Sequence, residues 1–168
     1  EYRLENMQYQ LISDWFDDIY YDDNDYYVIR KGRSRGLIHK LSFATVLWDN
    51  LCGYGSNGRI HSIYGYWGVC EDGKWAIIST HNSEIKHLTE YSFDKCSAYE
   101  KDTIQLQQND KYGCLLFDED SGTIRHFIPC VLNQLGASSI HNKELGRILN
   151  VNYNSQTLYL SRKGIIYK

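Results

Sequence analysis

Residues 103–116 of the chain read TIQLQQNDKYGCLL, and this stretch decides the class of fold. Apolar and polar residues alternate from Thr103 to Gln107, which is the pattern of a β-strand with one buried face. Polar residues 108–111 follow, and an apolar run returns at Cys114–Leu116. Apolar segments on both sides of a short polar turn predict two antiparallel strands joined as a hairpin.

The elements around this hairpin recur along the chain. Each copy begins with an aromatic residue followed by aspartate: Phe16-Asp17, Trp48-Asp49 and Phe93-Asp94. A glycine follows each aromatic residue 20 positions later: Gly36, Gly68 and Gly113. A fainter copy starts at Leu132-Asn133 and has no glycine in that position. Since recurrence of this kind is typical of repeat proteins, we expect four units, near residues 11–46, 47–91, 92–130 and 131–168.

The composition also favours an all-β chain. The 168 residues include 15 Tyr and 13 Gly but one Pro and one Met, a bias toward residues favoured in strands and tight turns. Helix signals are poor, and only residues 142–149 offer a candidate helical turn. We expect a single all-β domain over residues 1–168, built as an array of about four short antiparallel β-repeat units with about three strands each. The units would share one core, as an open stack or a propeller-like ring.

The aromatic-aspartate pair has an expected structural role. We expect the ring to enter the core, which places Trp48 among the buried residues, and Trp67 with it because it precedes one of the repeated glycines. The aspartate carboxylate can accept hydrogen bonds from backbone amides at a turn. Removing such a carboxylate, for example at Asp94, is expected to cost about 1 kcal/mol.

These copies resemble the WG-repeat family of bacterial proteins. The third copy is the nearest match, with KYGCLLFD at residues 111–118, GTI at residues 122–124 and the pair Ile128-Pro129. The second copy contains the dipeptide Trp67-Gly68, and residues 162–166 (RKGII) look like a truncated copy. The similarity covers most of the chain from about Leu11 onwards, although the first two copies lack the Ile-Pro pair. The resemblance implies a bacterial all-β repeat protein.

Charge and cysteine content restrict the class of function. A net charge of −3 at pH 7 argues against a dedicated nucleic-acid binder, which normally presents a basic face. Five widely spaced cysteines cannot form a closed disulfide framework, so we expect reduced, mostly buried thiols in a cytoplasmic protein. The longest apolar runs, of about four or five residues, are too short to span a membrane. No signal peptide is visible at the start of the sequence.

Two charged clusters suggest ligands but have simpler explanations. The acidic residues between Asp14 and Asp25 could hold Ca²⁺ or Mg²⁺, but without the ligand spacing of a calcium loop they fit a solvated turn better. Arg30, Arg33 and Arg35 follow on the next hairpin and could bind phosphates. Charge pairing with the acidic turn explains them more simply.

The cysteines and histidines suggest two further sites. Cys114, His126 and Cys130 invite a zinc interpretation, but no pair has the close thiol spacing that makes a zinc site convincing. Cys96 with His87, or Cys130 with His126, could form a nucleophile–base pair, yet no catalytic motif surrounds them. We therefore expect no catalytic residues, no metal and no cofactor.

Binding is the remaining class of function. Tyr and Trp often anchor protein interfaces because they bury a large area and keep a polar tip. We expect a non-catalytic protein-interaction module that binds another protein of unknown identity. The candidate interface residues are Tyr20, Tyr21, Tyr54, Tyr64, Tyr66, Arg33 and Arg35. Two alternatives stay open: a toxin-neutralising or defence-associated recognition domain, and a hydrolase that uses Cys and His or paired carboxylates.

Overall fold

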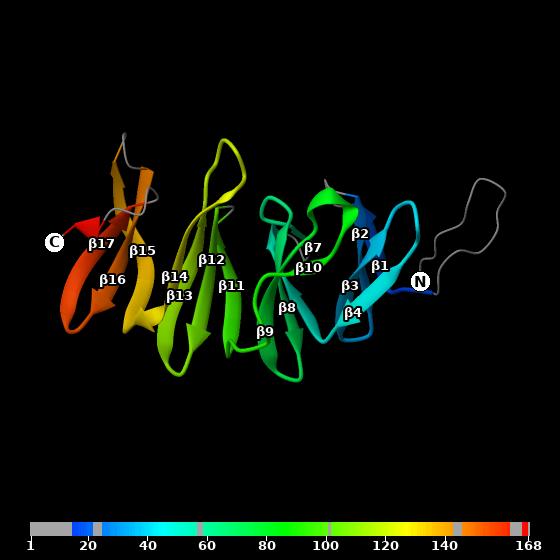
Figure 1. Ribbon diagram of the computed structural model, residues 1–168, viewed down its shortest axis with the longest axis horizontal. Coiled ribbons are helices and arrows are strands. Elements are labelled where there is room, and N and C mark those ends of the chain that lie inside the picture. Colours follow the sequence, from blue (N-terminus) through cyan, green and yellow to red (C-terminus); the bar gives the residue numbers. More distant parts are fainter. Residues whose placement is uncertain are drawn as a thin grey trace. The chain divides into compact units, whose positions relative to one another are not determined.

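The computed structural model describes residues 15–21, 25–56, 59–100, 102–142, 146–161 and 166–167. Its regular structure is almost entirely β, apart from the short 3₁₀ turn η1 (His81–Ser83), so the all-β prediction is confirmed (Figure 1). The helical turn predicted at residues 142–149 is wrong, because Gly146–Tyr153 is a strand. None of the described segments forms a helix with the length and apolar character needed to cross a membrane.

The described strands form four four-stranded antiparallel sheets that follow one another along the chain. The first sheet contains β1 (Asp18–Tyr21), β2 (Tyr26–Lys31), β3 (Ser34–His39) and β4 (Thr45–Trp48). The second contains β5 (Asn50–Cys52), β8 (Tyr66–Glu71), β9 (Lys74–Ser79) and β10 (Lys86–His87). The third contains β11 (Lys95–Glu100), β12 (Thr103–Gln108), β13 (Lys111–Phe117) and β14 (Ile124–Leu132). The fourth contains β15 (Gln134–Asn142), β16 (Gly146–Tyr153), β17 (Gln156–Ser161) and β18 (Ile166–Tyr167).

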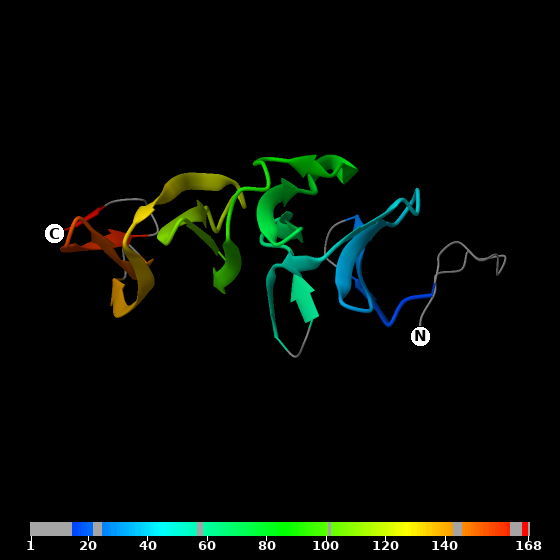
Figure 2. The same ribbon diagram turned by 90° about the horizontal axis from the view of Figure 1, so that it is seen from below.

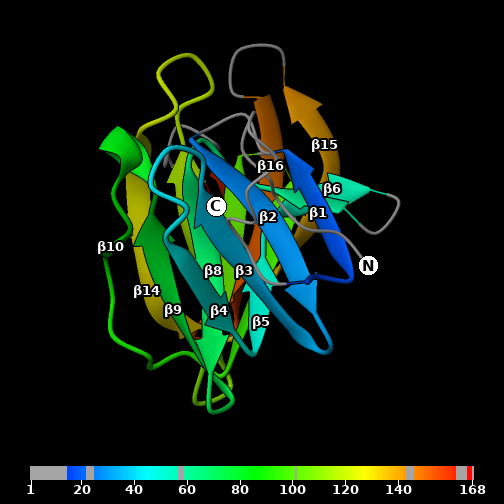
Figure 3. The same cartoon turned by 90° about the vertical axis from the view of Figure 1, so that its right-hand side faces the viewer.

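Each sheet is one repeat unit, with its four strands side by side in chain order, as Figure 3 shows for β1 to β4. Each unit therefore has one strand more than the sequence predicted. The second and third strands of a sheet form a central hairpin, as expected for β12 and β13. A small extra hairpin, β6 (Tyr54–Ser56) with β7 (Arg59–His61), is inserted between the first and second strands of the second sheet. This insertion projects away from β8 and β9 (Figure 2).

The chain divides into two compact units, Glu1–Ser92 and Phe93–Lys168, called here the N-terminal and C-terminal units. Apolar side chains between the two sheets of the N-terminal unit form its main core: Tyr20, Tyr26, Val28, Leu37, Trp48, Leu51, Trp67, Val69, Ala76 and Ile78. The burial predicted for Trp48 and Trp67 is thus confirmed. In the C-terminal unit the core contains Cys114, Leu116, Leu132, Leu135, Leu149, Val151 and Leu160.

The corner that opens each sheet is held by a repeated set of hydrogen bonds. An aspartate Oδ2 accepts a backbone N–H of the central hairpin turn: Gly32 N to Asp17 at 2.7 Å, Asp72 N to Asp49 at 2.8 Å, and Asn109 N to Asp94 at 2.7 Å. The backbone N–H of each aspartate also donates to a carbonyl of the second strand, as from Asp94 to Gln107 at 2.7 Å. Because this carboxylate joins the corner to the turn, its expected role is confirmed.

These hydrogen bonds also show that the second sheet does not align with the other two as the glycine spacing suggested. The aspartate precedes its turn amide by 15 residues in the first and third sheets but by 23 in the second. The inserted β6–β7 hairpin accounts for the difference. Gly36 and Gly113 lie on third strands, whereas Gly68 lies on the second strand β8, so the spacing of 20 matched Gly68 by coincidence. The equivalent position on the third strand β9 is Ala76.

Close approach of the fourth strand explains why two sheets need glycine at this position. A Cβ on Gly36 would lie 2.0 Å from the carbonyl oxygen of Val46, and a Cβ on Gly113 would lie 2.4 Å from that of Ile128. In the second sheet the fourth strand is only two residues long and pairs with Ile78 and Ser79, beyond Ala76. A methyl group therefore fits there.

We expect Asp94→Ala to lower the free energy of unfolding by about 1 kcal/mol, since the Asn109 amide loses its acceptor. Asp94→Asn keeps an oxygen acceptor in place and should retain most of that stability. Urea denaturation of the three proteins measures the difference. An unchanged midpoint for Asp94→Ala would contradict the role given to this carboxylate.

We expect Gly36→Ala to destabilise the protein by about 2 kcal/mol, since the new methyl group collides with backbone of β4 rather than with a flexible side chain. Gly136→Ala is the matched control, because nothing lies within 4 Å of a Cβ built there. Thermal unfolding should show a lower midpoint for the first variant and an unchanged or slightly higher one for the second. Equal midpoints would refute the close approach.

Candidate functional site

Tyr20, the first of the predicted interface residues, belongs to the core of the N-terminal unit. Its ring is 9% exposed, and its hydroxyl accepts a hydrogen bond from the backbone N–H of Ile60 at 2.9 Å. The guanidinium carbon of Arg59 lies 5.4 Å from the centre of the same ring, and the ring of His61 meets it edge-on at 5.9 Å. Tyr20 therefore holds the inserted hairpin against β1, a packing role that the sequence did not predict.

The other predicted tyrosines lie in different surroundings. Tyr54 is 49% exposed on β6. Tyr64 and Tyr66 flank the turn before β8, where the Tyr66 ring meets the His81 ring edge-on at 4.9 Å. Burial raises the pKa of Tyr66 above its ordinary value. The backbone of Tyr21 ends β1, and its side chain lies outside the described part of the structure.

The two predicted arginines lie near the central hairpin turn of the first sheet. Arg33 is in the turn itself and is exposed, and Arg35 is on β3 directly opposite Arg30 of β2. Tyr66, by contrast, opens β8 at the end of the second sheet away from its own central turn. Of the predicted interface residues whose side chains are described, Tyr20 and Arg35 line one hollow, whereas Arg33, Tyr54, Tyr64 and Tyr66 do not line it.

Part of the acidic run lies beside these arginines, because Asp18 of β1 is directly opposite Arg30 of β2. Asp25, in the connection from β1 to β2, is separated from Arg33 by the length of β2. Six residues of strand span about 17 Å. Among the described residues, neither Arg30, Arg33 nor Arg35 has a carboxylate at ion-pair distance. Asp22, Asp23 and the earlier acidic residue Asp14 lie outside the described part.

None of the described cysteines is in a disulfide, and burial makes several of them poor nucleophiles. Cys70 and Cys114 are buried, and Cys52, Cys96 and Cys130 are half-buried. Burial raises the pKa of Cys114 to about 12, helped by the neighbouring Cys130, and burial also raises the pKa of Cys130. Over the described residues, no three His, Cys, Asp or Glu side chains come together as a metal site would require.

We expect Cys114 to resist alkylation by iodoacetamide at pH 8 in the folded protein. A thiol with a pKa of about 12 is ionised in about one molecule in 10,000 at that pH, and the thiolate is the reactive form. Mass spectrometry should find Cys114 unmodified before unfolding and modified afterwards. A cysteine that reacts faster than a model thiol would instead support the hydrolase alternative.

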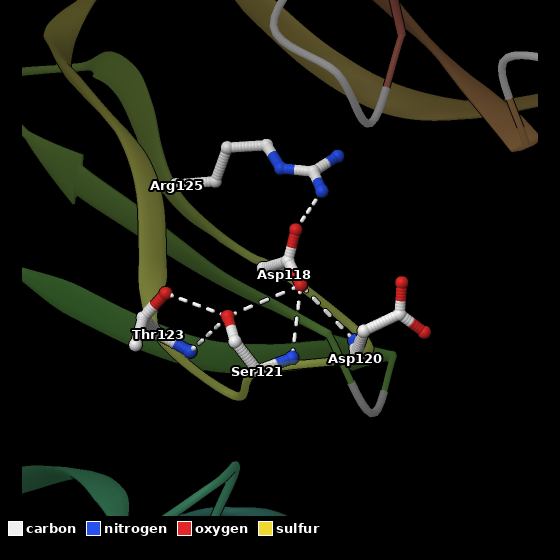
Figure 4. Close-up of polar contacts among 5 residues, drawn as sticks. All are labelled: Asp118, Asp120, Ser121, Thr123 and Arg125. Atoms are coloured by element: carbon white, nitrogen blue, oxygen red, sulfur yellow. Dashed lines mark hydrogen bonds and ion pairs between the residues drawn. The ribbon is translucent and has the colours of Figure 1, made fainter.

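The loop between β13 and β14 contains a polar cluster that is satisfied internally (Figure 4). Oδ1 of Asp118 accepts hydrogen bonds from the backbone N–H groups of Asp120 and Ser121, at 3.1 and 2.9 Å, and from the Ser121 hydroxyl. Its Oδ2 forms an ion pair with Arg125, and the Ser121 hydroxyl also bonds to that of Thr123. Since the carboxylate oxygens of Asp118 are engaged within the loop, this cluster shapes the turn.

Several of the exposed apolar side chains lie on or beside the fourth strands of the sheets. Val46 and Leu47 of β4 are 38% and 41% exposed, Phe127 and Val131 lie exposed on β14, and Leu88 directly follows β10. Successive residues of a strand point to opposite faces. Because Thr45, Val46 and Leu47 are all exposed, β4 is uncovered on both faces. β3, its neighbour, is buried on both faces at Leu37 and Ile38.

Strand β4 is also an edge strand, since it pairs only with β3 among the described strands. The outer edge of an antiparallel strand presents backbone N–H and C=O groups that can pair with another chain. We call Thr45, Val46 and Leu47 with this open edge the β4 surface. Sequence reasoning missed it, because nothing in the residues TVL distinguishes an edge strand from a central one.

No protein-family model matches this chain, and no curated protein matches it in sequence.

Proposed function

We propose that this chain is a non-catalytic protein-interaction module of a bacterial, WG-repeat-like cytoplasmic protein, and that its N-terminal unit binds another protein through the β4 surface. One observation carries the proposal. Val46 and Leu47 are exposed on opposite faces of a strand whose outer edge has no partner among the described strands.

An open strand edge with apolar side chains is a liability for a protein in solution. An edge strand with apolar side chains is a template for pairing with other chains, and natural proteins normally cover it or blunt it with charge, proline or a bulge. β4 has none of these devices within Thr45–Trp48. An extended partner segment could add to β4 as a fifth strand and cover Val46 and Leu47 with its own side chains.

Strand β14 is also an edge strand, but it has features that protect it from pairing with another chain. It carries the exposed Phe127 and Val131, but Pro129 in its middle lacks a backbone N–H. Its pairing with β13 is also interrupted by two shifts of register. Since both features weaken pairing along an edge, β4 is the better docking strand of the two.

We expect a photo-crosslinking residue, p-benzoylphenylalanine, placed at Leu47 to form one discrete adduct in the host cell, because position 47 lies within the proposed contact. Val46→Asp in the same protein should abolish that adduct, since a charge would be buried without a partner. Gel electrophoresis followed by mass spectrometry identifies the bound chain, including a second copy of this protein.

The matched control places the same crosslinker at Lys95, an exposed position on the first strand of the third sheet. No adduct from position 47, or the same adduct from positions 47 and 95, would overturn the proposal. Circular dichroism of Val46→Asp checks that loss of the adduct does not reflect unfolding.

A further inference from the structure

Arg30 and Arg35 of the first sheet lie directly opposite each other, in the closer of the two kinds of residue pair in an antiparallel sheet. The central hairpin closes at Lys31 and Ser34 around a two-residue turn, so the next pair, Arg30 and Arg35, is a non-hydrogen-bonded pair. The Arg30 carbonyl points away from β3, because it accepts a hydrogen bond from the Asp17 N–H on the β1 side at 2.8 Å. Side chains in such pairs have Cβ atoms about 4.5–5.5 Å apart, and like charges placed there repel.

Both arginines lie on the face of the first sheet that carries the main core of the N-terminal unit. They are two residues away from Val28 and Leu37, which belong to that core, and side chains two residues apart share a face. At this end of the face is a shallow hollow with a cavity volume of only about 10 Å³, lined by Asp18, Tyr20, Val28, Ile29, Arg30 and Arg35. Arg59 stacks on the ring of Tyr20, one of the walls, and adds a third positive charge.

The hollow therefore combines positive charge with apolar walls. Asp18 is its one acidic lining residue, and it makes no ion pair with Arg30 or Arg35 in the part of the chain that is described. Two guanidinium groups on adjacent strands can bind one carboxylate through charge-assisted hydrogen bonds. The hollow has room for about one water molecule and does not enclose a side chain, so a carboxylate would bind the two guanidinium groups at its rim.

We propose that Arg30 and Arg35 form a binding site for a carboxylate side chain, Asp or Glu, of an extended segment of the protein partner. The chain's net charge of −3 opposes a polyanion such as nucleic acid. Val46, exposed on the same face one strand beyond Arg35, would contact an apolar residue of the same segment.

This inference rests on the proposed function and specifies the chemistry of the partner: an acidic residue next to an apolar one. The test uses the blocked peptide acetyl-Glu-Leu-Glu-Leu-amide, with acetyl-Gln-Leu-Gln-Leu-amide as its uncharged counterpart. Titration is followed by NMR of the isotope-labelled protein, at the side-chain N–H groups of the arginines. We expect saturable shifts at Arg30 and Arg35 with the glutamate peptide and none with the glutamine peptide.

Charge-removing variants separate this site from general electrostatic attraction. Arg35→Gln and Arg30→Gln should each lower the affinity for the glutamate peptide by about tenfold, because one of two charge-assisted contacts is lost. Arg33→Gln removes the same charge from the turn outside the hollow and should weaken it less than about twofold. Backbone spectra of the three variants verify that they are folded.

Three outcomes would overturn the site: equal binding of the two peptides, equal weakening by Arg33→Gln, or tighter binding of an eight-nucleotide single-stranded RNA that Arg35→Gln abolishes. The last would indicate a nucleic-acid partner. Failure here is distinguishable from failure of the proposed function. If Arg35→Gln leaves the adduct from position 47 intact while Val46→Asp removes it, the carboxylate site is wrong and the interaction module stands.

Discussion

The hydrogen bond from a turn amide to a corner aspartate is the constraint on which the rest of the structure depends. It joins the residue that opens a sheet to the central hairpin of the same sheet, at Asp17, Asp49 and Asp94. With the turn held at the corner, the residue before the aspartate enters the core, as Phe16, Trp48 and Phe93 do. Each four-stranded sheet is then closed by local contacts, and apolar faces such as those between the first two sheets remain to be buried against a neighbour.

The corner and the hairpin could be predicted from the sequence because both depend on contacts between residues close in the chain. Aspartate after an aromatic residue, a polar two-residue turn and period-two alternation each have a local physical cause. The spacing of 20 residues between the aromatic residue and a glycine was misleading at Gly68, because a spacing in sequence cannot distinguish an inserted hairpin from a longer strand. Ala76 shows the underlying requirement, which is space beside the fourth strand rather than glycine as such.

The candidate site was less predictable, because exposure depends on what covers a strand. Tyr20 looked like a surface residue outside the repeat register, yet its hydroxyl bonds to Ile60, 40 residues away. The register places Asp18 of the acidic run opposite Arg30 and leaves Asp25 at the far end of β2, a division that the sequence does not show. Val46 and Leu47 have the apolar character of core residues. Only the order of strands in the sheet shows that they lie at its edge.

The inserted β6–β7 hairpin shows how this architecture can acquire new surface. It enters between the first and second strands of a sheet whose corner bond still forms, with the aspartate and the turn amide now 23 residues apart. Lengthening a connection costs little, since each doubling of loop length adds only about 0.6 kcal/mol of closure entropy. The first connection of each sheet is therefore a position where a foreign loop can be grafted, so one scaffold could be diversified at several places while its framework stays constant.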